Sequence, residues 1–280
     1  MENTILTFND QYFNLKDTLE CGQIFRFLPK DEGYLVFSMD KCAYCYNKDG
    51  NAYIECKKQD QSYFINFFDT ERDYSKIVQS AIESEYEILS KSAILGKGIR
   101  ILNQNPVETL FSFIISQNNN IPRIKNIIER LCTALGKKHV FMGIEYHAFP
   151  TVKEMASASL DFYKQIGLGY RAEYIKSLAN SMDNGFDVIS LGNLQTQALK
   201  GALQTILGVG PKVADCVSLF GFHRVDSFPV DTWIEKVYLQ DFNGKLLDRN
   251  KISKWFVEKF GQNAGFFQQY LFYYKRSLAQ

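Results

Sequence analysis

The stretch LGVGPKVADC, residues 207–216, decides the fold expected for this chain. An apolar segment with the composition of a helix, LKGALQTIL at 199–207, leads into it. Gly208, Val209 and Gly210 follow as a tight turn, in which glycine permits positive φ and a close approach by another backbone. Pro211 suits the first position of a new helix. The sequence therefore predicts two helices joined by a short glycine hairpin.

A hairpin of this kind predicts a phosphate-binding site built from the backbone of Gly208, Val209 and Gly210. The N–H groups of the hairpin and of the next helix N-terminus suit a phosphate oxygen. The net charge is +1, but residues 1–95 carry −6 and residues 96–280 carry +7. Many basic surfaces are only solvated, yet a basic C-terminal part beside such a hairpin favours a polyanionic partner.

The rest of the chain reads as a β-rich part followed by helices. Five short segments rich in β-branched and aromatic residues predict an antiparallel meander: TILTF, QIFRFLP, GYLVFSM, KCAYCYN and NAYIEC. Residues 75–93 have a helical period, and from about residue 105 the pattern is helical almost throughout. We therefore predict an α+β protein with an antiparallel β-rich domain over 1–100 and an all-α domain over 101–280.

The sequence predicts an intracellular protein. No run of about 18 apolar residues exists and the N-terminus lacks the features of a signal peptide, so no membrane segment is expected. The six cysteines are then expected to be reduced thiols, and a bacterial source would mean a cytoplasmic, nucleoid-associated protein. Cys42 and Cys45 with nearby Cys56 could suggest zinc, but they lack a clear fourth ligand and fall in an apparent strand. No metal site is predicted.

Lys212 lies in the first turn of the second helix, where the helix dipole disfavours a cation. It can be a solvated lysine, a phosphate contact or a nucleophile. The dipole and partial burial favour the neutral amine, which can attack carbon and form a Schiff base. Asp231 follows nineteen residues later in PVDTW, at the expected N-cap of another helix. It can be a simple cap, or a fixed carboxylate that stabilises positive charge developing nearby.

The hairpin lysine followed by an aspartate in a PVD segment resembles the helix–hairpin–helix DNA glycosylase superfamily. Four further segments resemble its 8-oxoguanine DNA glycosylases of the eukaryotic type: ECGQIFRF at 20–27, SQNNNIPRI at 116–124, IGLGYRAEYI at 166–175 and AGFFQQYLF at 264–272. The resemblance implies a bifunctional enzyme that excises 8-oxoguanine, preferably opposite cytosine, and cleaves the abasic strand by Schiff-base β-elimination. Lys212 would be its nucleophile, and Asp231 would stabilise the developing charge.

The same resemblance assigns a base pocket. The Gly22 carbonyl would accept a hydrogen bond from N7–H of 8-oxoguanine, where normal guanine has an acceptor. Gln268 would read the Watson–Crick edge, while Phe272 and Cys216 would lie against the two faces of the base. Taken without the resemblance, Gly22 fits a strand bend, Gln268 and Phe272 an ordinary helix, and Cys216 a buried core residue.

Four residues would act on the DNA around the everted base. Asn118 would enter the vacated space, Tyr170 would wedge beside the orphaned cytosine, and Arg123 and Arg171 would meet its acceptors. Each arginine alone is equally typical of a phosphate contact or a salt bridge. One departure is Trp233, which stands where relatives often have a histidine that holds backbone phosphate.

The cofactor and partner expectations follow. Relatives with an iron–sulfur cluster carry four C-terminal cysteines, whereas no cysteine follows Cys216, so neither a cluster nor another required cofactor is expected. Hairpin carbonyls could coordinate a monovalent cation. The expected partner is double-stranded DNA containing 8-oxoguanine, bound by a monomer. The alternatives are a non-enzymatic DNA-binding module, against which the pairing of Lys212 with Asp231 argues, and a glycosylase for other damaged bases.

Overall fold

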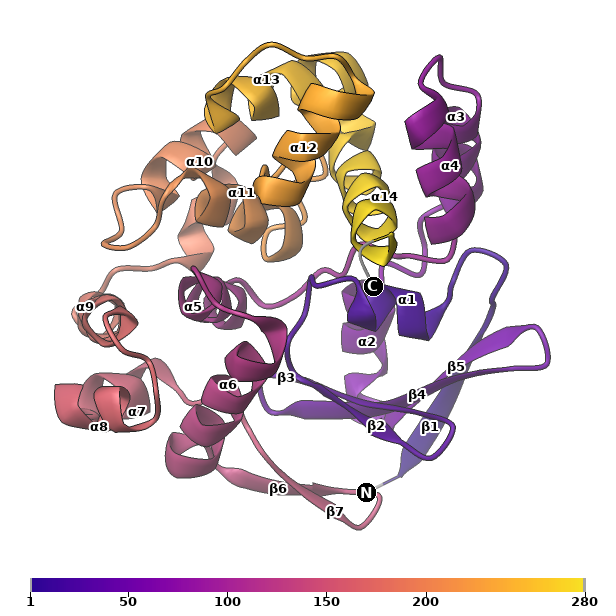
Figure 1. Ribbon diagram of the computed structural model, residues 1–280. Coiled ribbons are helices and arrows are strands. Elements are labelled where there is room, and N and C mark those ends of the chain that lie inside the picture. Colours follow the sequence, from indigo (N-terminus) through magenta and orange to yellow (C-terminus); the bar gives the residue numbers. More distant parts are fainter. Residues whose placement is uncertain (1, 279–280) are drawn as a thin grey trace.

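An antiparallel sheet forms the first part of the chain in the computed structural model, which describes residues 2–278 (Figure 1). Its strands are β1 (Asn3–Asn9), β2 (Phe27–Lys30), β3 (Gly33–Ser38), β4 (Lys41–Lys48) and β5 (Asn51–Lys57). The spatial order is β1-β5-β4-β3-β2, so the antiparallel sheet is confirmed and β2–β5 form a meander, but β1 differs from the prediction because it pairs with β5 and not with β2. Along β5, Ala52, Ile54 and Cys56 are buried and alternate with half-buried residues, as expected for a sheet with one covered face.

One predicted strand is shorter than expected. Of the segment QIFRFLP, residues 23–26 are not in a strand. The buried amide of Gln23 donates to the Thr18 and Arg100 carbonyls at 2.9 and 2.7 Å, and its oxygen accepts from the Leu102 N–H. These bonds satisfy a loop that passes between the sheet and the helices, and they replace the strand ladder.

Two short helices that the sequence did not reveal cover the buried face of the sheet. They are α1 (Leu15–Glu20) and α2 (Gln61–Phe67). Phe13, Phe64, Phe67 and Phe68 are fully or almost fully buried between these helices and the strands. The β-rich part therefore has an apolar core of its own.

The remaining helices form a second, larger core. Their bounds are α3 (Tyr74–Ile82), α4 (Glu87–Gly96), α5 (Pro106–Ser116), α6 (Ile121–Leu135), α7 (Val152–Ser157), α8 (Leu160–Gln165), α9 (Arg171–Asp183), α10 (Thr196–Leu203), α11 (Pro211–Phe220), α12 (Thr232–Asp241), α13 (Arg249–Phe260) and α14 (Ala264–Ser277). Short 3₁₀ turns lie at Lys58–Asp60, Ile189–Asn193 and Gly261–Asn263. The helices predicted beyond residue 105 are present, with ends shifted by a few residues.

The single helix expected at 75–93 is two helices. The break at residues 83–86 lets the Tyr86 ring pack against Phe242, with ring centroids 4.7 Å apart. Both helices belong to the larger core, and α4 packs closely against α14. Figure 1 shows α3 and α4 beside α14, although they are far apart in the sequence.

A β-hairpin interrupts the part of the chain that was expected to be all-helical. Its strands, β6 (Lys138–Phe141) and β7 (Ile144–His147), are joined by Met142 and Gly143, both with positive φ. Turns of this geometry match the twist of a two-residue hairpin. Phe141 and Tyr146 pack against the sheet, where the Tyr146 and Phe37 ring centroids lie 5.3 Å apart.

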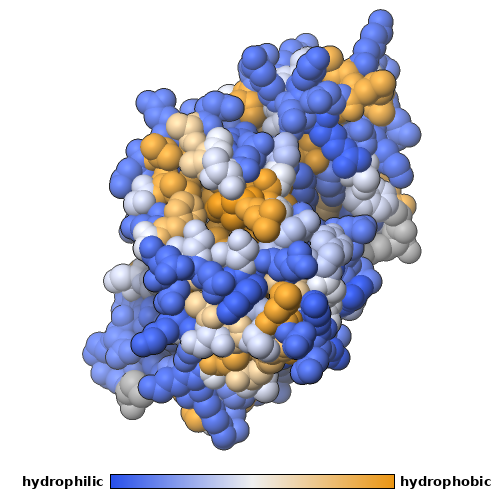
Figure 2. Space-filling view, turned by 90° about the vertical axis from the view of Figure 1, so that its left-hand side faces the viewer, coloured by the Kyte–Doolittle hydropathy of each residue, from blue (hydrophilic) through white to orange (hydrophobic). Residues whose placement is uncertain are grey.

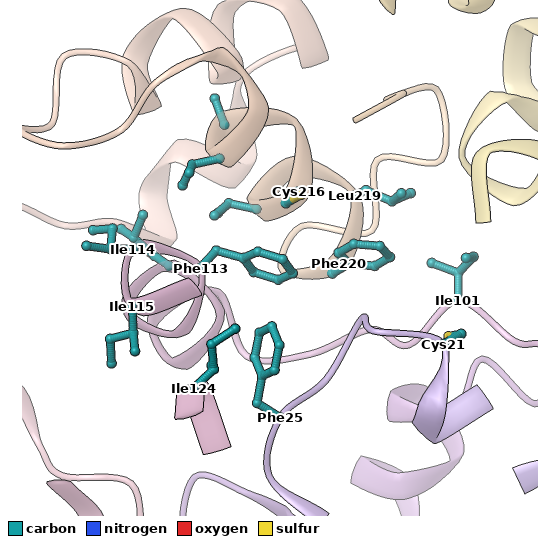
Figure 3. Packing of buried hydrophobic residues seen from close by; sticks show 14 of the residues in the cluster. Cys21, Phe25, Ile101, Phe113, Ile114, Ile115, Ile124, Cys216, Leu219 and Phe220 are labelled. Atoms are coloured by element: carbon teal, nitrogen blue, oxygen red, sulfur yellow. The ribbon is translucent and has the colours of Figure 1, made fainter. Parts of the chain in front are cut away.

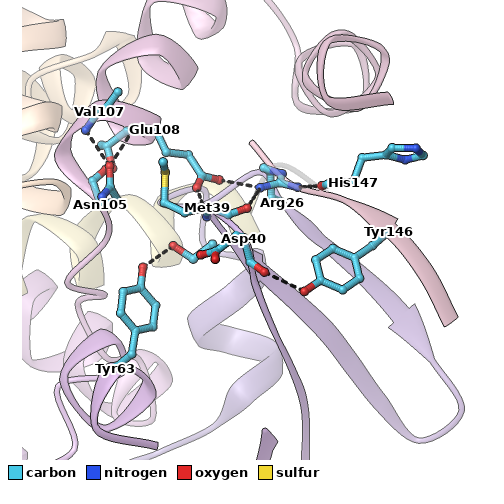
Figure 4. A network of polar contacts seen from close by, with 11 residues as sticks. Arg26, Met39, Asp40, Tyr63, Asn105, Val107, Glu108, Tyr146 and His147 are labelled. Carbon is cyan, nitrogen blue, oxygen red and sulfur yellow. Dashed lines mark hydrogen bonds and ion pairs between the residues drawn. The ribbon is translucent and has the colours of Figure 1, made fainter. Parts of the chain in front are cut away.

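A buried ion pair joins the sheet to the helices (Figure 4). Arg26 lies 3.4 Å from Glu108 of α5 and donates to the His147 carbonyl at 2.6 Å. Glu108 in turn accepts from the Met39 N–H at 2.6 Å. Burial raises the pKa of Glu108, and the Arg26 guanidinium opposes that rise. The arginine of the ECGQIFRF segment therefore fixes the arrangement of β7, α5 and the turn after β3.

The six cysteines are free and buried. Within residues 2–278, no three His, Cys, Asp or Glu side chains are grouped so that they could hold a metal ion. None of the described helices combines the length and the apolar character needed to cross a membrane.

Candidate active site

The hairpin between α10 and α11 is as tight as its glycines predict. Gly208 has φ +83°, and a Cβ atom there would lie 2.4 Å from the Tyr174 ring, so only glycine fits. Gly210 differs from the prediction of positive φ, because it is an extended N-cap residue with φ −88°. A Cβ on Gly210 would meet no atom within 4 Å, and no side chain caps α11 among the described residues. The first N–H groups of α11 are therefore open to an anion.

Lys212 lies in the first turn of α11 with one aromatic ring near its amine. Its Nζ lies 5.4 Å from the centre of the Phe113 ring. Cys216 follows one helical turn later and is buried. Burial raises the pKa of the Cys216 thiol to about 11, and the nearby Lys212 opposes this rise. Cys216 is therefore a protonated thiol at neutral pH.

Asp231 caps α12 as predicted. One of its oxygens, Oδ1, accepts from the N–H groups of Trp233 and Ile234 at 2.9 and 3.0 Å. Within the described chain no hydrogen bond ends on Oδ2. The charge of Asp231 contributes to the raised pKa of Cys216. Val230, the residue before Asp231, lines the same small cavity as Lys212. Lys212 and Asp231 therefore lie at the starts of two helices, α11 and α12, and their joint catalytic role stays a prediction.

Gly22 and Phe272 meet although they come from opposite ends of the chain. Gly22 has φ +92°, and a Cβ there would lie 3.4 Å from Phe272 Cε1. Gln268 stands one turn before Phe272 on α14 and is buried. Its Nε2 donates to the Pro229 carbonyl at 3.2 Å, two residues before Asp231, while its buried Oε1 has no partner within residues 2–278. A buried amide oxygen without a donor is the group a bound ligand can satisfy.

Three phenylalanines that the sequence did not reveal line the same region. Figure 3 shows Phe25, Phe113 and Phe220 pointing toward one another between Cys21 and Cys216. The Phe113 ring is stacked on the Phe220 ring, with ring centroids 5.7 Å apart. It meets the Phe25 ring in an edge arrangement, with centroids 5.5 Å apart. Apolar periodicity marks all three as core residues, so nothing in the pattern separates a pocket wall from ordinary packing.

The four residues predicted to act on the DNA around the base lie at the starts of α6 and α9 or in the turns just before these helices. Asn118 has φ +46° in the turn between α5 and α6, and Tyr170 is 52% exposed at the start of α9. Arg123 is exposed and donates to the Gly167 carbonyl at 3.2 Å. Leu207, in the hairpin, is also half exposed. Figure 2 views the molecule from the side where α7–α10 lie and shows apolar patches between hydrophilic residues.

Arg171 is buried and its guanidinium is bound to backbone carbonyls of this protein. It is 3% exposed, and its guanidinium donates to the Gln117 carbonyl at 2.8 Å and to the Asn118 carbonyl at 2.9 Å. Its guanidinium also lies 4.4 Å from the centre of the Tyr170 ring. In this conformation Arg171 ties the loop of Asn118 to α9, and the contact with cytosine stays a prediction.

A buried polar cluster behind α11 was also missed by sequence reasoning. Asp215 forms an ion pair with Lys200 of α10 at 2.5 Å, and the Ser253 hydroxyl of α13 lies 3.2 Å from its other oxygen. Burial raises the pKa of Asp215, and Lys200 opposes the rise. Asp215 also lines a small cavity of about 170 Å³ together with Lys212, Val230 and Arg249. Asp215 follows Lys212 by three residues on one helix, and this spacing is the sequence feature that could have predicted that the two lie on the same face.

Comparisons with known proteins match both parts of the chain. Residues 5–110 match the family described as 8-oxoguanine DNA glycosylase, N-terminal domain. Residues 111–261 match the HhH-GPD superfamily base excision DNA repair proteins. The sheet with its short helices lies in the first match, and the hairpin with Lys212 and Asp231 lies in the second.

Solved structures agree over the whole fold. The Clostridium acetobutylicum 8-oxoguanine glycosylase/lyase in complex with dsDNA containing cytosine opposite 8-oxoG superposes with a TM-score of 0.92. It is 34% identical, and the match covers 99% of this chain and 99% of that chain. The apo-form of the same Clostridium protein gives a TM-score of 0.91 at 35% identity and covers 98% and 96%.

Two curated relatives are both named N-glycosylase/DNA lyase. The Arabidopsis thaliana N-glycosylase/DNA lyase OGG1 is 35% identical over 190 residues, 63% of this chain and 52% of the plant protein. The Saccharomyces cerevisiae N-glycosylase/DNA lyase is 38% identical over 159 residues, 52% of this chain and 42% of the yeast protein. The match thus spans about half the length of these curated relatives. The chain belongs to the 8-oxoguanine DNA glycosylase/lyase group of the HhH-GPD superfamily of base excision DNA repair proteins.

Proposed function

We propose that this chain excises 8-oxoguanine from double-stranded DNA and then cleaves the abasic strand. The observation that carries the proposal is the place of Lys212 in the first turn after an open glycine hairpin, one helical turn before the buried Cys216 and on a small cavity that Val230, the neighbour of Asp231, also lines. The names of the Arabidopsis and yeast relatives, N-glycosylase/DNA lyase, support both activities. The Clostridium structure supports the base, because that protein is described with 8-oxoG in dsDNA.

In the proposed reaction the neutral amine of Lys212 attacks C1′ of the deoxyribose. The lone pair of Nζ forms the new bond while the bond from C1′ to the base breaks, and its electron pair leaves with the base, which takes up a proton. The Asp231 carboxylate, held by its two cap hydrogen bonds, stabilises the positive charge that develops on the sugar. Only Oδ1 is used by the cap, so Oδ2 can face the sugar.

The strand is then cut through the covalent intermediate. After the attack the nitrogen is a secondary ammonium, which gives up a proton to the departing base. The resulting amine then donates its lone pair to C1′ as the C1′–O4′ bond opens and O4′ takes up a proton, which gives a protonated Schiff base. Loss of a proton from C2′ sends its electrons toward the iminium and expels the phosphate from C3′, which is a β-elimination. Water later hydrolyses the imine and frees Lys212.

The base pocket that we propose lies between Cys216 and Phe272. The Gly22 carbonyl accepts from N7–H, and Gln268 offers the amide oxygen that has no partner in the described chain to the Watson–Crick edge. Guanine would bring its N7 lone pair against the same carbonyl. A buried polar contact left unpaired costs about 1–3 kcal/mol, which is enough for useful discrimination.

On the other side of the duplex, the proposal places Asn118 in the vacated space and Tyr170 as the wedge. Arg123 is exposed and can reach the acceptors of an orphaned cytosine. Arg171 would act on that base through the loop that it holds, or directly if it leaves the Gln117 and Asn118 carbonyls. A preference for cytosine opposite the lesion follows.

We propose further that the chain acts as a monomer without a required cofactor or iron–sulfur cluster, and that hairpin carbonyls can hold a monovalent cation. It would be located inside the cell on the DNA, and in a bacterium it would be associated with the nucleoid. Backbone N–H groups at Gly210 and in the first turn of α11 would bind the phosphate near the lesion.

Borohydride trapping on an 8-oxoguanine duplex tests the chemistry. The wild-type chain should form a covalent adduct with DNA, and Lys212→Gln should abolish it. Lys76→Gln is the matched control, because Lys76 is also in the first turn of a helix but is exposed on α3. No adduct with the wild type, or an undiminished adduct with Lys212→Gln, would overturn the Schiff base. Equal cleavage of a thymine glycol duplex would overturn the choice of base.

A further inference from the structure

Helix α14 carries a third side chain on the face that holds Gln268 and Phe272. Arg276 follows Phe272 by one helical turn, so residues 268, 272 and 276 form one stripe along the helix. Its guanidinium carbon lies 5.6 Å from the centre of the Phe272 ring. Its Nη2 donates to the Glu20 carbonyl, two residues before Gly22. Arg276 is thus anchored beside the two residues proposed to bind the base.

The other terminal nitrogen of Arg276 has no hydrogen-bond partner. Nη1 is buried, and no acceptor within residues 2–278 lies in hydrogen-bond geometry with it. A Cβ atom on Gly22 would lie only 3.3 Å from Nη1, so this nitrogen lies directly against Gly22. A buried guanidinium N–H without an acceptor costs free energy, and its persistence calls for a ligand that supplies one.

The charge of Arg276 is also not neutralised by a carboxylate. Within the described chain, Arg276 belongs to none of the ion pairs. Two carboxylates of α1 have other partners, because Glu20 accepts from the Tyr34 hydroxyl at 2.9 Å and Asp17 from the Tyr273 hydroxyl at 2.8 Å. A hydrogen bond from Nη1 to a neutral carbonyl oxygen would therefore be charge-assisted and strong.

The lesion supplies such a carbonyl next to the group that Gly22 is proposed to read. 8-Oxoguanine carries N7–H and C8=O side by side, a donor and an acceptor on one edge, whereas guanine carries an acceptor and a C–H there. The Gly22 carbonyl and the Arg276 N–H form the complementary acceptor and donor. We propose that Arg276 is a specificity-determining residue that donates from Nη1 to O8 of the everted 8-oxoguanine. This inference rests on the proposed function and adds a second contact to its base reading.

Binding to two uncleavable duplexes tests the contact. One contains 2′-fluoroarabino-8-oxoguanine, which has N7–H and O8. The other contains 9-deazaguanine, which has N7–H but no O8. Arg276→Met should weaken binding of the first duplex about tenfold or more and of the second by about threefold or less, since only the first offers O8. The ratio of the two losses measures the contact with O8 separately from any general loosening of the site.

Arg72→Met is the matched control. Arg72 also lies over a phenylalanine of α14, 5.5 Å from the Phe266 ring centre, but at the opposite end of the helix. It should change neither affinity. Arg276→Gln serves if the methionine variant does not fold, as judged by circular dichroism, and should show the same inequality with a smaller ratio because the amide donor is neutral.

The outcomes separate the two proposals. Equal losses on both duplexes would overturn the contact with O8 and leave Arg276 as a support for the turn at Gly22. Equal losses that extend to undamaged DNA, with a smaller salt dependence of binding, would mean a phosphate contact and would also overturn it. A wild-type chain that does not prefer the 8-oxoguanine duplex over a guanine duplex would instead overturn the proposed function itself.

Discussion

The Ser253 hydroxyl lies 2.8 Å from the Phe228 carbonyl oxygen, to which it donates a hydrogen bond. It also lies 3.2 Å from Oδ2 of Asp215 on α11, one turn after Lys212. Phe228 lies in the buried segment 227–230, which leads directly into Asp231. One hydroxyl on α13 therefore bridges the helix of the proposed nucleophile and the segment of the proposed carboxylate.

Ser253→Ala should lower the free energy of unfolding by about 1–3 kcal/mol, because it leaves the buried Phe228 carbonyl without its donor and removes the polar neighbour of Asp215 Oδ2. Urea denaturation measures this loss. Single-turnover excision should slow by about tenfold or more, since Lys212 and Asp231 are less firmly placed. Ser277→Ala removes an exposed hydroxyl that donates to the Tyr274 carbonyl at 2.7 Å and should cost less than about 0.5 kcal/mol. Equal losses in the two variants would contradict the bridging role.

Alanine substitutions of the two hairpin glycines should have different effects on stability and on DNA binding. Gly208→Ala combines positive φ with a Cβ 2.4 Å from the Tyr174 ring, so it should lose about 1–3 kcal/mol of stability and also bind DNA more weakly. Gly210→Ala has φ −88° and open space around its Cβ, so it should fold normally and lose only DNA affinity. Thermal unfolding and fluorescence anisotropy with a duplex separate the two. Unchanged binding by Gly210→Ala would mean that the backbone there does not face phosphate.

The native cysteines should react slowly at ordinary pH. Burial raises the pKa of Cys216 and Cys56 to about 11, and of Cys21, Cys42 and Cys132 to about 12. The reactive form is the thiolate. Reaction with Ellman's reagent at pH 8 should therefore be slow and should speed up as the pH rises toward 11. The denatured chain, as control, should release six equivalents quickly. A native thiol that reacts fast at pH 7 would show a thiolate and contradict the protonated Cys216.

The two arginines near Asn118 should have different roles: Arg123 recognises the opposite base, and Arg171 also stabilises the loop of Asn118. Arg123→Met should reduce the ratio of excision opposite cytosine to excision opposite adenine, with little change in stability, because its side chain is exposed. Arg171→Met should also lower the melting temperature, because three backbone carbonyls lose their donor. Single-turnover rates on the two duplexes and thermal unfolding measure both effects. An unchanged ratio in both variants would remove them from recognition of the opposite base.

Local chemistry explains why so much of the helical part was predictable. Pro106, Pro211 and the capping Asp231 mark helix starts by rules that depend only on neighbouring residues. The β6–β7 hairpin was missed because its stability comes from packing of Phe141 and Tyr146 on the sheet, which no local pattern encodes. The break between α3 and α4 has the same origin, in the contact of Tyr86 with Phe242.

The site divides in a similar way. Lys212, Asp231 and the hairpin were found because their roles depend on helix ends, which the sequence marks. Phe113 and Phe220 look like any core residue along the chain. Only the fold stacks the two rings on each other (Figure 3) and places Phe113 near the Lys212 Nζ. The position of Arg171 inside the protein likewise depends on the carbonyls of a loop more than fifty residues away.

The contact of Gln269 with the Cys21 carbonyl, 2.8 Å long, joins residues 248 positions apart. During synthesis α14 is the last of these elements to be made, so the turn at Gly22 must wait for it while the hairpin of α10 and α11 can already form. Backbone binding should therefore mature before base discrimination on the growing chain.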